Sequence, residues 1–201
     1  MNMQKAVILF EKIRDLPYGT SGNNGMWSCY QKCVYLQREL QKVDIASQLL
    51  IGVFNWQDLP IPDRILKLRQ CRNERHVMLR VFINGSVCDI DPSVDNKLVS
   101  ILPISQWDGI SSTITMAPLK HLRIYQPHSL HERISSRLRH QFFGCNPEKF
   151  YTELDLWLTA YRTKSRLTET SRLEPGWVYR RWPISRCPCR RLWRWRYRRR
   201  W

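Results

Sequence analysis

Hydrophobic positions in the first part of the chain recur at helical spacing. Within Met3–Arg14 the apolar residues lie mostly three or four positions apart, which predicts an amphipathic helix. After a loop rich in glycine and asparagine, Ser28 is placed to cap a second helix over Cys29–Val43. The apolar face of this second helix is formed by Cys29, Cys33, Leu36 and Leu40. The pattern therefore predicts two helices before any strand.

From residue 49 onward the pattern changes to short apolar runs typical of strands. Leu49–Phe54 is one such run, and His76–Ile83 and Ser86–Ile90 are two more. The dipeptide Asn84-Gly85 is a strong hairpin signal, because both residues tolerate positive φ. We therefore expect the last two strands to pair antiparallel, with Asp91-Pro92 ending the second.

The remaining segments are less regular. A short helix is expected within Asp63–Gln70, and a further strand is expected near Leu122–Tyr125. Two helices are predicted over Leu130–Phe143 and Pro147–Arg162. Together these elements indicate an α+β fold, in which a central helix packs on an antiparallel sheet and further helices follow.

Composition changes along the chain suggest three parts. Residues 1–128 are expected to form a core, residues 129–165 a helical extension, and residues 166–201 a poorly ordered tail rich in arginine and tryptophan. The tail also holds most of the excess charge. The whole chain has 33 Lys and Arg against 17 Asp and Glu, a net charge of +16, yet residues 1–176 carry only +6.

The tail has two interpretations. In Arg190–Trp201 guanidinium groups alternate with aromatic rings, a composition that binds phosphates, stacks on bases or lies on an anionic membrane surface. A nonspecific anionic partner bound through the tail is one interpretation. A terminal extension without a binding role is the other.

The seven cysteines favour a reducing compartment. The apolar run Ala6–Phe10 is too short for a secretory signal, and no segment approaches the ~20 apolar residues of a membrane helix. We therefore expect a cytoplasmic protein with mostly free thiols and no transmembrane segment. Cys187-Pro-Cys189 lacks the spacing of a usual zinc finger, so neither a metal nor another cofactor is expected.

Cys29 is the cysteine best placed for chemistry. At the start of a helix, unpaired N–H groups and the helix dipole stabilise a thiolate, and an imidazolium stabilises it further. His76 heads one predicted hairpin strand, and the hairpin brings Asp91 beside it, so one imidazole nitrogen can bind the carboxylate while the other faces the sulfur. Cys29, His76 and Asp91 are thus a nucleophile, a base and the group that orients the base.

Cys29–Gly52 resembles the core helix and following strand of the transglutaminase-like superfamily, which has a papain-like fold. His76–Gly85, continued by Asp89-Ile-Asp-Pro92, is similar to the histidine strand and the aspartate-proline strand of that family. The resemblance covers roughly residues 8–95. It implies that Cys29 is the nucleophile, His76 the base and Asp91 the third member of a catalytic triad.

The sequence departs from the family at several positions. Trp27 stands where the family often has glycine, and the turn at Asp44–Gln48 lacks the glycine, proline and arginine of the family pattern. Two rival residues stay open: Asp89 could replace Asp91, and Cys33 could replace Cys29, although Cys33 lies one turn inside the helix. An oxyanion hole would use the Cys29 N–H. The second donor or the pocket wall is assigned to Asn24, Trp27 or Trp56.

The expected activity is that of a cysteine hydrolase or acyltransferase acting on an amide or ester through an acyl-enzyme. The substrate would be a peptide, a protein or a small acyl compound. Two alternatives belong to other classes. One is a catalytically inactive binding module with the same fold, and the other is a nucleic-acid or anionic-membrane binder that works through its tail.

Overall fold

A computed structural model describes residues 2–20, 25–69, 73–126 and 147–170. Residues 1–168 form one compact unit. Its helices and strands, in chain order, are α1 (Asn2–Arg14), α2 (Cys29–Gln41), β1 (Ala46–Asn55), α3 (Asp63–Leu66), β2 (Asn73–Ile83), β3 (Ser86–Ile90), β4 (Lys120–Ile124) and α5 (Pro147–Thr170).

The four strands form one antiparallel sheet in the order β3-β2-β1-β4. The predicted hairpin joins β2 and β3, with Asn84 at φ 50° and Gly85 at φ 76°, the left-handed conformation that this two-residue turn requires. The register of the hairpin places Leu79 opposite Ile90. It follows that His76 and Asp91 lie near the same end of the hairpin.

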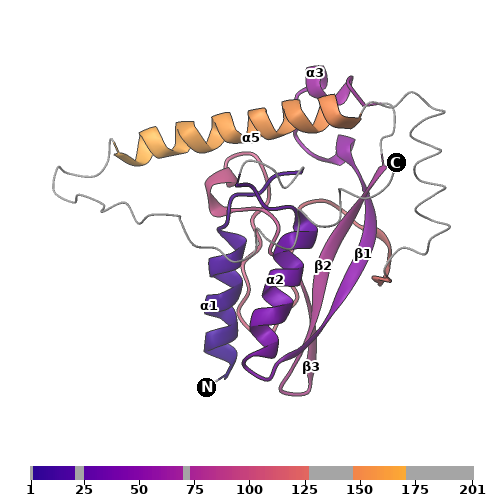
Figure 1. Ribbon diagram of the computed structural model, residues 1–201, viewed down its shortest axis with the longest axis vertical. Helices are drawn as coiled ribbons and strands as arrows, with labels where there is room; N and C mark the ends of the chain where they lie inside the picture. Colours follow the sequence, from indigo (N-terminus) through magenta and orange to yellow (C-terminus); the bar gives the residue numbers. More distant parts are fainter. Residues whose placement is uncertain (1, 21–24, 70–72, 127–146, 171–201) are drawn as a thin grey trace, which may run out of the picture. The chain divides into compact units, whose positions relative to one another are not determined.

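One core lies between the sheet and the first two helices. Figure 1 shows α1 and α2 side by side, with α2 next to the sheet. Buried side chains of this core include Phe10 and Ile13 from α1, Leu36 and Leu40 from α2, and Leu79, Val81 and Ile90 from the sheet. Because α2 contacts α1 as well as β1 and β2, it is the central helix of the α+β fold.

A second core joins α5 to the end of the sheet. Phe54 and Trp56, at the end of β1 and just after it, pack in one cluster with Phe150, Leu154 and Trp157 of α5. Leu59 and Ile61, in the segment before α3, and Ile65 of α3 are buried in the same core. The long helix α5 is thus packed into the same unit as the sheet.

The observed elements confirm most of the predicted ones. The two N-terminal helices, the hairpin and the helix from Pro147 are present, and the α+β class is correct. The α3 helix ends at Leu66, earlier than expected, and β4 begins at Lys120. The helix predicted over Leu130–Phe143 and the tail beyond Thr170 lie outside the described residues. No helix in the described part of the chain combines the length and apolar character needed to cross a membrane.

Candidate active site

Cys29 is the first residue of α2. Ser28 caps the helix with a capping box, in which its side chain accepts from the Gln31 N–H while the Gln31 side chain accepts from the Ser28 N–H. The N–H groups of the first helical turn have no acceptor within the helix, and the helix dipole favours negative charge there. The half-buried Cys29 thiol therefore lies at the N-terminal end of the helix, which is the end that stabilises a thiolate.

His76 and Asp91 form a buried pair. His76 is on β2 and Asp91 directly follows β3, and their exposed fractions are 0% and 1%. His76 Nε2 lies 2.8 Å from Asp91 Oδ2, so the imidazole N–H donates to the carboxylate. The hairpin register predicted this proximity.

Three further groups hold the Asp91 carboxylate and backbone. Its Oδ1 accepts from the Ser93 N–H at 3.0 Å, and its Oδ2 accepts from the Met116 N–H at 3.2 Å. Its own N–H donates to the Thr113 hydroxyl at 2.9 Å. With both oxygens occupied, the carboxylate has a fixed orientation toward His76.

The charges of this pair stabilise each other. Burial by itself lowers the pKa of His76, but the Asp91 charge and hydrogen bond, assisted by the neighbouring Cys29 side chain, raise that pKa to about 10. Burial raises the pKa of Asp91, and the opposing effects of His76, Ser93 and Met116 bring it below its usual range. At neutral pH the pair is therefore an imidazolium and a carboxylate.

Cys29 and His76 line the same pocket, which has a volume of about 170 Å³. The Nδ1 atom of His76 is buried and makes no hydrogen bond of ordinary geometry among the described residues. Since Nε2 is bound to Asp91, Nδ1 is the nitrogen left for the sulfur. Other lining residues are Tyr18, Gly19, Thr20, Ser28, Phe54, Trp56, Glu74, Arg75, Met116 and Tyr151.

The three predicted pocket residues have different locations. Trp56 lines the pocket and is buried. Trp27 is not among the lining residues; its ring stacks on Tyr35 at 5.6 Å, and its backbone N–H donates to the Pro17 carbonyl. Asn24 lies outside the described residues.

The two rival residues have other partners. Asp89 forms a bidentate ion pair with Arg80, at 2.7 and 2.8 Å, near the protein surface. Cys33 is fully buried, where its Sγ lies 3.3 Å from the Val77 carbonyl oxygen and burial raises the pKa of the thiol. Neither residue lines the pocket that holds Cys29 and His76.

Sequence reasoning missed Glu74 and Tyr151, two residues far apart in the chain that both line the pocket. The Glu74 carboxylate accepts from the Tyr151 hydroxyl and from Arg69, whose guanidinium packs over the rings of Trp56 and Tyr151. Glu74 lies two residues before His76, so the strand period puts both side chains on one face. That period is a signal for Glu74, whereas no local pattern indicates Tyr151.

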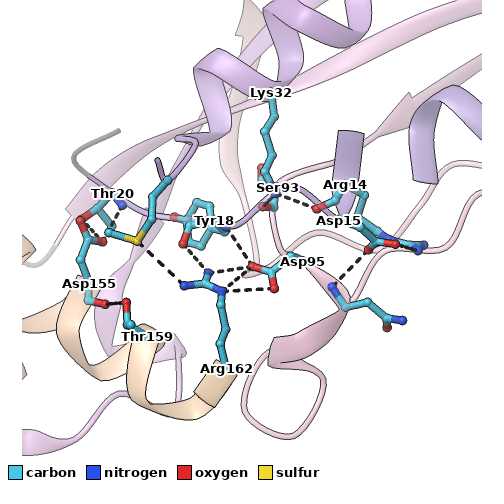
Figure 2. A network of polar contacts seen from close by, with 12 residues as sticks. Arg14, Asp15, Tyr18, Thr20, Lys32, Ser93, Asp95, Asp155, Thr159 and Arg162 are labelled. Carbon is cyan, nitrogen blue, oxygen red and sulfur yellow. Dashed lines mark hydrogen bonds and ion pairs between the residues drawn. The ribbon is translucent and has the colours of Figure 1, made fainter. Parts of the chain in front are cut away.

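A second polar network connects α5 to the loop before Cys29. Arg162 of α5 forms an ion pair with buried Asp95 at 2.7 Å and also donates to the Tyr18 carbonyl (Figure 2). Asp95 accepts from the Tyr18 N–H, and Asp155 of α5 accepts from both the N–H and the hydroxyl of Thr20. Tyr18 and Thr20 line the pocket, so α5 helps to position its wall.

The arrangement provides a thiol at a helix N-terminus and an imidazole at one small pocket, with the buried Asp91 carboxylate bound to that imidazole. Burial raises the pKa of Tyr18 well above its usual value, and the charge of adjacent Cys29 adds to this effect.

Across the described residues, no three His, Cys, Asp or Glu side chains gather closely enough to hold a metal ion. Comparison of the chain with protein-family models, with curated proteins and with solved structures gives no match.

Proposed function

We propose that this chain is a cysteine-dependent hydrolase or acyltransferase with a transglutaminase-like, papain-like arrangement of its site. The observation that carries the proposal is the meeting of Cys29 and the His76–Asp91 pair at one pocket. The order of elements agrees with it, because the helix that begins with Cys29 precedes an antiparallel pair of strands, with His76 on the first strand and Asp91 directly after the second.

The reaction has two steps. The Cys29 thiolate attacks the carbonyl carbon of an amide or ester, and the bond to the leaving amine or alcohol breaks as the His76 imidazolium gives it a proton. Water or an amine then attacks the thioester, His76 accepts the proton of this second nucleophile, and Cys29 leaves as the thiolate. Asp91 keeps the imidazole oriented and stabilises its charged form.

The oxygen of the attacked carbonyl needs hydrogen-bond donors as its charge develops. The Cys29 N–H is one, since a first-turn N–H has no acceptor within its helix. Trp56 is the candidate for the second: its indole N–H is buried at the pocket wall and has no partner among the described residues. Its use requires the indole to turn toward the pocket when substrate binds.

The volume and the lining residues of the pocket indicate which substrate groups fit. A volume of about 170 Å³ accepts one side chain or a short acyl group, and its walls combine the aromatic rings of Tyr18, Phe54, Trp56 and Tyr151 with polar and charged side chains. The proposed substrate is therefore a peptide, a protein or a small acyl compound that inserts a single group. A reducing, cytoplasmic compartment is part of the proposal, because the reaction uses a free thiol.

Limited alkylation tests the proposal. The protein is treated with a small amount of iodoacetamide at pH 6, and the labelled cysteines are identified by mass spectrometry. We expect Cys29 to react at least tenfold faster than the other thiols, because it begins a helix and shares a pocket with the His76 imidazole, and both features activate a cysteine. Buried Cys33 is an internal comparator on the same helix.

Two variants sharpen this test. His76→Ala removes the imidazolium and should abolish the preference for Cys29, while Asp89→Asn, in the rival aspartate, should retain it. With p-nitrophenyl acetate as a probe, an acetylated Cys29 should be detected in the wild type and be absent from Cys29→Ala. Uniform slow labelling of all thiols would instead favour an inactive binding module.

A further inference from the structure

A lysine is buried directly beneath the site. Lys32 lies three residues after Cys29 on α2, has an exposed fraction of 0% and is among the largest fully buried side chains of the described protein. Its Nζ donates to the backbone carbonyls of Arg14 and Ser93, each at 2.7 Å (Figure 2). An ammonium group is costly to bury, so these two bonds and the charges nearby must compensate for lost water.

The two acceptors belong to segments that surround the site. Arg14 is the last residue of α1, where the carbonyls lack partners within the helix. Ser93 lies two residues after Asp91, and its N–H donates to Asp91 Oδ1. Ser93 therefore links Lys32 to Asp91: its carbonyl accepts from the lysine, and its N–H donates to the carboxylate.

This path connects the two halves of the site. It runs from the helix that carries Cys29, through the Lys32 ammonium and Ser93, to Asp91 and then to His76. The pairing of β2 and β3 places His76 near Asp91. The Lys32 bond to Ser93 adds a direct polar connection between α2 and the segment after β3. A change at Lys32 would thus act on the orientation of the carboxylate.

Several charged groups surround the ammonium. Burial lowers the pKa of Lys32 to about 7; Asp95, Asp91 and Asp15 oppose this effect, and Arg162 adds to it. The Tyr18 ring centroid lies 6.0 Å from Nζ, and the Arg14 side chain is directed to Asp15 and to the Ser105 carbonyl. A neutral amine still has two N–H donors for the two carbonyls, so the connection survives deprotonation.

We propose that Lys32 is a positioning residue, which fixes the Asp91 segment against the nucleophile helix and so orients His76 toward Cys29. This inference rests on the proposed function for its catalytic meaning. The geometric part, in which Lys32 orders the His76–Asp91 pair, can be tested without any reaction at Cys29.

The first measurement uses the wild-type protein. The ammonium protons of Lys32 are followed by NMR on lysine-labelled protein at pH 6. Two buried hydrogen bonds predict slow exchange with water, in contrast to an exposed lysine such as Lys67. Exchange of Lys32 as fast as that of Lys67 would overturn the proposal, whatever the variants do.

The second measurement follows the His76 imidazole in Lys32→Met, which keeps the apolar volume and removes the donors. The Nε2–H proton bound to Asp91 should give a downfield signal in the wild type and should broaden or shift in the variant. Lys32→Gln, which retains one amide donor group, should be intermediate. Leu40→Ala, in the same helix two turns away, should weaken the fold but leave the signal in place.

The third measurement is the pH profile of Cys29 alkylation by iodoacetamide. Misplacement of the imidazole should lower the rate at pH 6 by roughly tenfold or more in Lys32→Met, with the gap narrowing toward pH 9, where an ordinary thiol ionises. A folded Lys32→Met with an unchanged imidazole signal and an unchanged profile would refute the positioning role. If Lys32→Met does not fold, Lys32→Gln and the wild-type exchange measurement decide.

The two proposals fail in different ways. A wild-type Cys29 that reacts no faster than the other thiols contradicts the proposed function, while the imidazole signal still reports on Lys32. A reactive wild-type Cys29 together with an insensitive imidazole signal contradicts only the role of Lys32.

Discussion

Among single residues, His76 and Lys32 are both buried bases, and their surroundings act on them in opposite directions. His76 is bound to a carboxylate, and its pKa is raised to about 10 from an ordinary 6.5. Lys32 is bound to two neutral carbonyls, and its pKa is lowered to about 7 from 10.5. A carboxylate at hydrogen-bond distance outweighs burial, whereas carbonyl dipoles and more distant carboxylates do not.

The raised pKa of His76 predicts a pH-dependent stability. The folded protein keeps a proton on His76 between pH 6.5 and about 10 that the unfolded chain loses, so the free energy of unfolding should fall as pH rises through this range. The contribution is fully present below pH 6.5. It should decline by up to about 1.4 kcal/mol per pH unit as pH rises toward 10.

Chemical unfolding of wild type and His76→Gln at several pH values checks this prediction. The excess stability of the wild type should be largest near pH 6 and smallest near pH 10. Lys32 acts in the opposite sense between about pH 7 and 10.5, but it is present in both proteins and cancels in the difference. A difference that grows with pH would contradict the assignment of a charged His76.

On the scale of secondary-structure elements, the start of α2 places the thiol. The Ser28–Gln31 capping box satisfies donors at both ends of the first turn, and Cys29 follows Ser28 immediately. The helix start is therefore defined by side chains rather than by packing alone.

Ser28→Ala should destabilise the protein by about 1 kcal/mol, since the alanine cannot accept from the Gln31 N–H. Urea unfolding measures the loss. Gln31→Ala is the matched variant, because it removes the other half of the capping box and should also lower stability. Unchanged stability in both variants would show that the cap contributes nothing to α2.

The elements with local signals were predictable. Ser28 indicated the start of α2, and Asn84-Gly85 indicated the hairpin that brings Asp91 to His76. Lys32 was not predicted to be buried, because lysine usually lies in solvent. A signal was present: Lys32 lies three positions after Cys29 and four before Leu36, within the apolar stripe of the helix.

At the scale of the whole molecule, distant segments build one pocket. Tyr151 of α5 is a wall of the pocket that contains Cys29, and Arg162 ties the same helix to Asp95 and Tyr18. The apolar spacing of the sequence predicted the helix α5. It did not predict that α5 lines the pocket. Contacts between residues so far apart in the chain depend on tertiary packing, which no local pattern records.

Arg162→Met should destabilise the protein by about 3–5 kcal/mol, because it leaves the buried Asp95 carboxylate without its ionic partner. Arg64→Met is the control: Arg64 is exposed and lies 3.9 Å from the partly exposed Glu153 of α5, so a loss of less than about 1 kcal/mol is expected. Denaturant unfolding compares the two variants. Equal effects would mean that the Arg162–Asp95 pair is no more important than a surface pair.

The late position of Tyr151 has a consequence for synthesis on the ribosome. Cys29, His76 and Asp91 leave the exit tunnel first, and the helix that carries Tyr151 follows several seconds later at ordinary translation rates. Until then the nascent chain has its thiol and imidazole without the wall that shapes access to them. The pocket around Cys29 is therefore complete only after α5 has emerged and docked.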